Sequence, residues 1–261
     1  MWWKRALFWG LLPIAAPQGL AARRRAPRFA PAAGPDRGRF GAGYGPPSDA
    51  PLRLLGLGDS IIDGVGCANH EEAFTGRVAA ALAAMGGRPV EWRALGRTGA
   101  CAAEMVEHLL PQLDDPPPDL VVISVGVNDV SGLKRSARFR RDLGALLDGL
   151  RIRSPEALVV LCGLPQMQRF PLLPQPLRWL AGLRAQTFDA IAAELAAERG
   201  GVVHVPTLYF PEAHEFAADG YHPNAATQGR WAEVLVVKIA SRVAPPPQRD
   251  ADGQPLTAMA D

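Results

Sequence analysis

The sequence predicts an α/β domain built as a three-layer α/β/α sandwich around a five-stranded parallel sheet. Short apolar runs that suit buried strands alternate with longer segments whose apolar residues recur at helical spacing. No long insertion interrupts this alternation, which favours a parallel sheet with right-handed crossovers. The expected strands are residues 52–58, 90–95, 120–125, 158–162 and 202–205, and the expected helices are 72–85, 102–113, 136–151, 177–198 and 225–243.

The length of the chain leaves room for one such domain. Its 261 residues include Pro-rich ends, and without them about 190 residues remain, which is enough for one sizeable core. We expect the domain at residues 52–243, a Pro-, Gly- and Arg-rich linker at 26–51 and a disordered tail at 244–261.

Residues 1–25 form an apolar segment with a basic start and three arginines at its end. Its basic start and apolar centre are typical of a signal peptide, but the arginines that follow oppose translocation, and the segment is short for spanning a membrane. Its three tryptophans suit a membrane interface. We therefore expect membrane association with the domain on the cytoplasmic side, with export by a signal peptide as the alternative.

Charge and cysteine content exclude several other classes of function. The net charge is +2 and the arginines are scattered beside acidic residues, so no nucleic-acid surface is indicated. Cys67, Cys101 and Cys162 form an odd set without CxxC spacing, which favours neither a disulfide framework nor a zinc site.

Polar motifs follow the predicted strands at the edge where an open α/β sheet binds its ligands. Asp59 and Ser60 follow the first strand, and we expect Asp59 to brace the loop. Ser60 is the candidate nucleophile, which requires a base and a group that orients the base. His222 and Asp219 have the spacing for these two roles. Taken singly, each of these residues is more typical of a turn, a helix cap or the surface than of catalysis.

Four short motifs occur along the chain in the following order: GDS at 58–60, GRTG at 96–99, GVND at 126–129 and DGYHP at 219–223. Together they resemble the SGNH (GDSL-type) hydrolase family over residues 52–243. The resemblance implies a flavodoxin-like fold, and it implies that Ser60 attacks, His222 is the base and Asp219 orients it. The resemblance also implies that no metal or organic cofactor is needed.

The resemblance also implies an oxyanion hole. Its donors would be the backbone N–H groups of Ser60 and Gly99 and the side-chain amide of Asn128, with Gly96 as the alternative to Gly99. The second motif of the family often opens with an asparagine that helps to hold the loop. This chain has Ala94 or a near neighbour at that place, which puts the loop geometry in question.

These observations predict a serine hydrolase that cleaves small-molecule or lipid-like esters through an acyl-enzyme on Ser60. An acyl transferase with the same acyl-enzyme is one alternative, and a non-catalytic, membrane-tethered lipid-binding module is another. The apolar, Pro-rich segment 163–179 follows the fourth strand. It suits an acyl pocket, a membrane-facing loop or a packed crossover.

Overall fold

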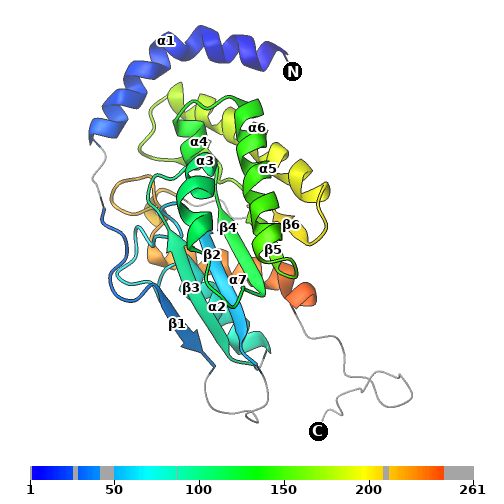
Figure 1. Cartoon of the computed structure of the whole chain (residues 1–261). Coiled ribbons are helices and arrows are strands. Elements are labelled where there is room, and N and C mark those ends of the chain that lie inside the picture. Colours follow the sequence, from blue (N-terminus) through cyan, green and yellow to red (C-terminus); the bar gives the residue numbers. More distant parts are fainter. Residues whose placement is uncertain (1, 26–28, 42–49, 87, 208–211, 244–261) are drawn as a thin grey trace.

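In the computed structural model, which describes residues 2–25, 29–41, 50–86, 88–207 and 212–243, helices cover both faces of a six-stranded sheet (Figure 1). The strand order is β1-β3-β2-β4-β5-β6. The strands are β1 (Arg37–Phe40), β2 (Leu52–Gly58), β3 (Val90–Gly96), β4 (Leu120–Ser124), β5 (Leu158–Cys162) and β6 (Val202–Val205).

The last five strands are parallel, and their order matches the flavodoxin-like arrangement predicted from the sequence. β2 lies between β3 and β4, and Gly58 at its end is level with Gly96 on one side and Ser124 on the other. The three polar motifs that follow these strands therefore begin at one edge of the sheet. The predicted three-layer α/β/α fold is confirmed.

The sixth strand is a correction to the prediction, because β1 lies within segment 26–51, which we expected to be a linker. It pairs antiparallel with β3, and its four residues alternate between exposed and half-buried. The ring of Phe40 stacks on Trp92 with the centroids 6.3 Å apart. A polar edge strand of this length carries no apolar run, so periodicity alone does not reveal it. Residues 26–28 and 42–49 of the expected linker lie outside the described residues.

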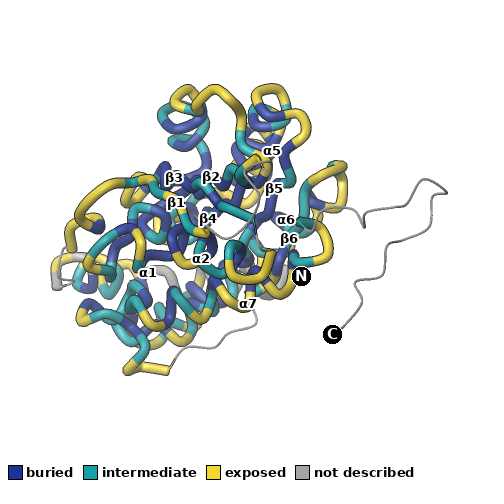
Figure 2. Tube along the Cα trace, turned by 90° about the horizontal axis from the view of Figure 1, so that it is seen from below, coloured by how far each residue is buried: buried dark blue, intermediate teal, exposed yellow. Residues whose placement is uncertain are grey.

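Two helices cover one face of the sheet and a larger group covers the other (Figures 1 and 2). The first pair is α2 (Phe74–Gly86) and α7 (Ala225–Val243), and the second group includes α5 (Ser136–Arg153) and α6 (Leu177–Ala197). Helix α5 buries apolar residues at helical spacing, which drives its packing on the sheet. They are Phe139, Leu143, Leu146, Leu147 and Leu150.

The expected helix at 102–113 is broken. The chain forms a short helix, α3 (Ala102–Glu104), then a π-helical turn at Met105–Leu109 and a 3₁₀ turn at Leu110–Gln112. Pro111 lies within the 3₁₀ turn, and proline cannot donate the backbone hydrogen bond that a continuing α-helix needs. A short helix, α4 (Val127–Ser131), follows β4, and further 3₁₀ turns occur at Met167–Arg169 and Ala213–Glu215.

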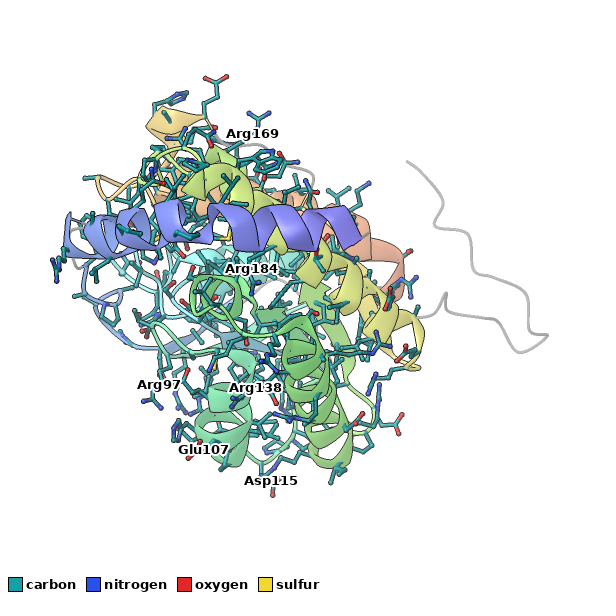
Figure 3. All side chains as sticks on the ribbon, turned by 90° about the horizontal axis from the view of Figure 1, so that it is seen from above. Arg97, Glu107, Asp115, Arg138, Arg169 and Arg184 are labelled. Carbon is teal, nitrogen blue, oxygen red and sulfur yellow. The ribbon has the colours of Figure 1, made fainter. Side chains whose placement is uncertain are left out.

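The N-terminal segment forms helix α1 (Trp2–Arg25), which crosses the top of the molecule (Figures 1 and 3). The amide of Gln18 donates to the carbonyl of Gln175 at 2.8 Å and accepts from the N–H of Leu177 at 3.3 Å. Ala15 and Ala22 are buried. Across the described ranges, no helix combines the length and hydropathy needed to cross a membrane. The expected disordered tail, 244–261, lies outside the described residues.

Candidate active site

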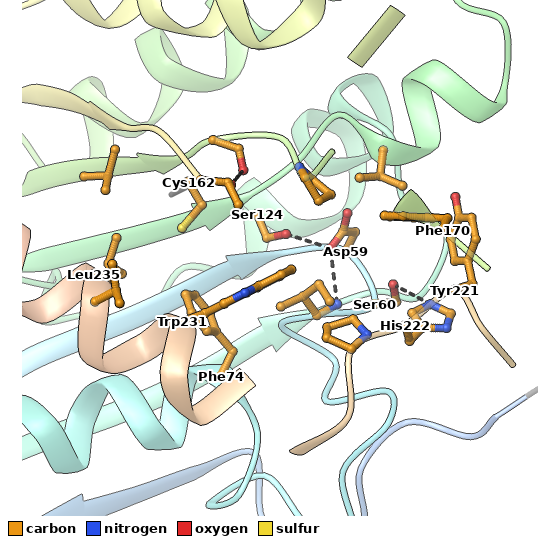
Figure 4. A pocket seen from close by; sticks show the side chains of 18 of the residues that line it. Asp59, Ser60, Phe74, Ser124, Cys162, Phe170, Tyr221, His222, Trp231 and Leu235 are labelled. Atoms are coloured by element: carbon orange, nitrogen blue, oxygen red, sulfur yellow. Dashed lines mark hydrogen bonds between the residues drawn. The ribbon is translucent and has the colours of Figure 1, made fainter. Parts of the chain in front are cut away.

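Three of the predicted site residues form a chain of hydrogen bonds at the carboxyl edge of the sheet, and Figure 4 shows the part between Ser60 and His222. Ser60 Oγ lies 3.0 Å from Nε2 of His222, and Nδ1 of the same ring lies 2.5 Å from Asp219 Oδ2. Ser60 follows β2, whereas His222 and Asp219 belong to the loop before α7. The fold thus joins a hydroxyl, an imidazole and a carboxylate that are far apart in the sequence.

The carboxylate of Asp219 is held in its charged form although it is buried. Its Oδ1 accepts the backbone N–H groups of Tyr221 at 2.9 Å and His222 at 3.0 Å. Burial alone would raise the pKa of Asp219, but the His222 ring and these two N–H groups outweigh it and lower the pKa. An ionised Asp219 favours the tautomer in which Nδ1 of His222 carries the proton. Nε2 is then available to accept from Ser60.

The predicted oxyanion donors lie around the loop that follows β3. Asn128, in the first turn of α4, donates from its amide nitrogen to the carbonyl of Ala100 at 3.0 Å, which uses one of its two amide hydrogens. Gly99 is exposed and has a φ of +84°, a conformation that favours glycine. Over the part of the chain that the structure describes, the backbone N–H groups of Ser60 and Gly99 donate to no protein acceptor.

Asp63 holds this loop, and the sequence analysis did not identify it. Its Oδ2 accepts from the N–H of Thr98 at 2.9 Å and from the hydroxyl of Thr98 at 2.5 Å. The N–H of Arg97 donates to the carbonyl of Gly58 at 3.0 Å. Ala94, where the family often has an asparagine, is buried within β3. In this chain, therefore, bonds to Gly58 and Asp63, on either side of Ser60, brace the loop.

The alternative donor, Gly96, has a different reason to be glycine. A Cβ atom at this position would lie 2.3 Å from the backbone nitrogen of Asp63, whereas one at Gly99 would meet nothing within 4 Å. Close approach of the nucleophile loop thus explains Gly96, and the open space at Gly99 suits a bound ligand.

The amide of Gln228, on the first turns of α7, joins the two halves of the site. Its Oε1 accepts from the N–H of Phe74 at 3.0 Å, and its Nε2 donates to the carbonyls of Val65 at 2.9 Å and Pro223 at 3.2 Å. Gln228 is fully buried. It was also missed in the sequence analysis, where the only signal is a polar residue among the apolar positions of a helix.

Asp59 braces the nucleophile turn, as predicted. Its Oδ1 accepts from the N–H of Ile61 at 3.2 Å and from the hydroxyl of Ser124 at 2.9 Å (Figure 4). Burial raises the pKa of Asp59 to about 6, and the two hydrogen bonds and His222 oppose this shift.

Asp129, the last residue of the GVND motif, is fully buried behind Asn128. Its Oδ2 accepts from the N–H of Ala102 at 3.1 Å, whereas its Oδ1 is buried without a hydrogen-bond partner among the described residues. Burial raises the pKa of Asp129 to about 6, against the opposing effects of Ala102 and Lys134. The Asp129 carboxyl therefore links α4 to α3. Its ionisation in this buried place lowers the stability of the fold.

A cavity begins beside Ser60 and His222 and extends toward Cys162, Trp231 and Leu235 (Figure 4). All three cysteines are free thiols, and burial raises the pKa of Cys162 to about 12. The apolar segment 163–179 contributes only Gly163, Pro165 and Phe170 to the lining. No group of three His, Cys, Asp or Glu side chains in the described ranges is placed to hold a metal ion.

Comparison with known proteins gives consistent matches. Residues 57–230 match the GDSL-like Lipase/Acylhydrolase family. An alignment over 200 positions, which covers 72% of the chain, gives 30% identity to the GDSL-like esterase Rv1075c of Mycobacterium tuberculosis. It covers 62% of that protein, so the chain spans less than two thirds of this relative.

Solved structures support the fold. The lipase/acylhydrolase from Enterococcus faecalis superposes with a TM-score of 0.58 at 24% identity, over 75% of this chain and 99% of that one. The salicylyl-acyltransferase SsfX3 from a tetracycline biosynthetic pathway superposes with a TM-score of 0.53 at 20% identity, over 75% of this chain and 56% of that one.

The buried carboxyl of Asp129 predicts a pH-dependent cost to stability. A pKa that is higher in the folded than in the unfolded chain gives stability that is present below about pH 4 and is lost as the pH rises through about 6. Asp129→Asn keeps an acceptor for Ala102 and removes this loss. Between about pH 4.5 and pH 7.5, its free energy of unfolding should gain on the order of 2 kcal/mol relative to the wild type.

Urea unfolding at the two pH values measures this gain. The exposed Asp115→Asn serves as the control and should follow the wild type. Parallel pH dependence in the wild type and Asp129→Asn would contradict the assignment.

Proposed function

The chain belongs to the GDSL-like lipase/acylhydrolase family, and from this premise we propose that it is a serine hydrolase that cleaves carboxylic esters through an acyl-enzyme on Ser60. The observation that carries the proposal is the hydrogen-bonded series from Ser60 through His222 to the ionised Asp219. The expected substrate is a small-molecule or lipid-like ester.

In the proposed first step, Nε2 of His222 takes the proton of the Ser60 hydroxyl as Oγ bonds to the ester carbonyl carbon. The resulting imidazolium is stabilised by Asp219, whose Oδ2 lies 2.5 Å from Nδ1. When the tetrahedral intermediate collapses, the bond to the ester oxygen breaks and His222 returns the proton to the leaving alcohol. Water then attacks the acyl-enzyme, again with His222 as the base, and releases the acid and the free serine.

The developing oxyanion needs preplaced donors. We assign this role to the N–H groups of Ser60 and Gly99, which have no protein acceptor among the described residues, and to the second amide hydrogen of Asn128. The bond from Asn128 to Ala100 keeps the amide beside the Gly99 loop. Little reorganisation is then required when the charge forms.

An acyl transferase is the alternative enzyme, because an alcohol in place of water would accept the same acyl group. The fold is shared with the salicylyl-acyltransferase SsfX3. Product analysis with added alcohols distinguishes the two activities. A non-catalytic lipid-binding module differs from both, because its lipid association would not depend on Ser60.

We also propose that α1 binds a membrane surface, with the domain on the cytoplasmic side. The segment carries Lys4, Arg5 and three arginines at 23–25 without any acidic residue. Ile14 and Leu20 of the helix are exposed. A segment that combines basic residues in its sequence with exposed apolar side chains suits an anionic lipid surface. Export by a signal peptide is the alternative.

Replacing the nucleophile should abolish turnover. Ser60→Ala removes the attacking oxygen, so kcat for p-nitrophenyl ester hydrolysis should fall by about 10⁴-fold or more. The exposed Ser241→Ala, on α7, is the matched control and should retain wild-type kcat. Full turnover by a folded Ser60→Ala protein would refute the acyl-enzyme.

Removing the proposed oxyanion amide should impair the chemical step more than binding. Asn128→Ala should lower kcat by roughly 10²- to 10³-fold with a much smaller change in KM, because the donor acts mainly on the transition state. Steady-state kinetics measure both constants, and circular dichroism checks that the fold is intact. A change confined to KM would assign Asn128 to substrate binding instead.

Membrane binding should depend on the basic end of α1. The full-length protein should sediment with phosphatidylglycerol vesicles at low salt and much less with phosphatidylcholine vesicles. Replacing all three arginines at 23–25 with glutamine should weaken this sedimentation. Equal binding to both kinds of vesicle, unaffected by the substitutions, would contradict an electrostatic surface contact.

A further inference from the structure

We propose that the cavity between the carboxyl ends of β5 and β6 and helix α7 is the acyl-binding pocket, and that Trp231 limits the length of the acyl chain it accepts. The inference rests on the proposed function, since it concerns the acyl part of an ester whose carbonyl carbon is placed at Ser60. It assigns acyl selection mainly to α7 rather than to the Pro-rich segment 163–179.

The cavity leads from the nucleophile into the interior of the protein. Figure 4 shows Ser60 and His222 near one end and Leu235 at the other, with Trp231 and Phe74 side by side along one wall. Cys162 and Ser124 lie on the opposite side. An acyl chain attached to Ser60 would therefore extend past Trp231 toward Leu235.

The lining suits an apolar guest. Its inner part is formed by aromatic and aliphatic side chains, and several of its polar side chains are engaged in hydrogen bonds within the protein. Asp59 Oδ1 accepts from Ser124, and the hydroxyl of Thr207 donates to the carbonyl of Gly163. The thiol of Cys162 remains protonated, because its burial raises its pKa to about 12. The apolar residues of this part of the lining are Phe74, Val205, Trp231, Val234 and Leu235, of which Val234 is exposed at the surface.

The size of the cavity favours a single, fairly short chain. Its volume is about 90 Å³, on a scale where one water molecule needs roughly 10–15 Å³. This is room for a few water molecules, or for a run of several methylene groups in their place. The bulk of a two-chain lipid would have to remain outside, so the structure favours linear acyl groups of short to medium length.

Trp231 is placed to define the length of this run. It lies on the face of α7 that packs toward the sheet and is only half-buried. Leu235, one helical turn further along, is buried at the inner end of the cavity. A smaller side chain at 231 would lengthen the space beyond Ser60, and a larger one at 235 would shorten it.

The test compares the wild type, Trp231→Ala and Leu235→Phe in the full-length protein on p-nitrophenyl esters from acetyl to dodecanoyl. In the wild type, kcat/KM should rise by up to about fourfold for each methylene that enters the cavity and then fall once the cavity is full. Trp231→Ala should move the maximum to longer esters and Leu235→Phe to shorter ones. The readout is the rank order of the esters within each variant, so it does not depend on how fast either variant cleaves the acetyl ester.

Val237→Ala is the matched control, because this valine lies on the same helix but is 72% exposed. It should keep the wild-type profile at every chain length. The proposal is overturned if Trp231→Ala and Leu235→Phe also keep that profile while esters are being cleaved. If Trp231→Ala does not fold, Leu235→Phe decides the outcome by the direction of its shift.

A binding measurement separates this inference from the proposed function. Calorimetric titration of decanoate into the Ser60→Ala protein should show binding that Leu235→Phe, made in the same background, weakens about tenfold or more. If the wild type cleaves no ester but shows this binding pattern, the esterase proposal fails and the acyl pocket stands. If decanoate binding is absent or unaffected by Leu235→Phe, the pocket assignment fails, whether or not esters are cleaved.

Discussion

The site depends on keeping two distant segments of the chain within hydrogen-bonding distance of each other. Ser60 and His222 are separated by 162 positions in the sequence and meet at 3.0 Å. The buried amide of Gln228 maintains this distance, because it binds Phe74 and Val65 after the nucleophile and Pro223 beside the histidine. Buried groups that lose their partners cost on the order of 1–3 kcal/mol each. Separation of the two segments would therefore leave several buried polar groups without hydrogen-bond partners at once.

The sheet supplies the other half of this constraint. Parallel pairing sets the ends of β2, β3 and β4 level with one another, so the nucleophile and the proposed oxyanion donors begin from one rigid edge. Hydrogen bonds between the loops at this edge then fix the positions of the proposed donors. Asp63 holds Thr98 and Asn128 holds Ala100, which leaves Gly99 between two anchored neighbours. Preplaced donors of this kind need not be reorganised during a reaction.

Elements with a strong apolar pattern could be predicted from the sequence. The last helix was expected at residues 225–243 and begins and ends there as α7, because its buried positions recur at helical spacing over the full length. The five parallel strands were found within one or two residues, because each is a short apolar run that suits a buried strand. Ser60, His222 and Asp219 were identified because their residue types suit a nucleophile, a base and an orienting acid, and because the four motifs together resemble the SGNH hydrolase family.

The parts that could not be predicted are fixed by contacts between segments far apart in the sequence. β1 has no apolar run, and its place depends on pairing with β3 and on the stacking of Phe40 on Trp92. Asp63 and Gln228 are ordinary polar residues until the fold places a backbone partner opposite them. The inner cavity likewise combines Phe74 from the start of α2 with Trp231 from α7. No local sequence pattern indicates that these two residues line the same cavity.

Three buried aspartates near the site differ in how strongly their surroundings favour the charged form of the carboxyl. Burial raises the pKa of Asp59 and Asp129 to about 6, because each has too few donors to replace the lost water. Asp219 is also buried, yet its pKa is lowered, since the tight turn before α7 aims two backbone N–H groups and the His222 ring at its carboxylate. Of the three, Asp219 is the one that bonds the His222 ring and whose surroundings favour its charge, so it is suited to stabilise an imidazolium. The short DxxH spacing matters because it provides both the partner and the donors that keep this aspartate ionised.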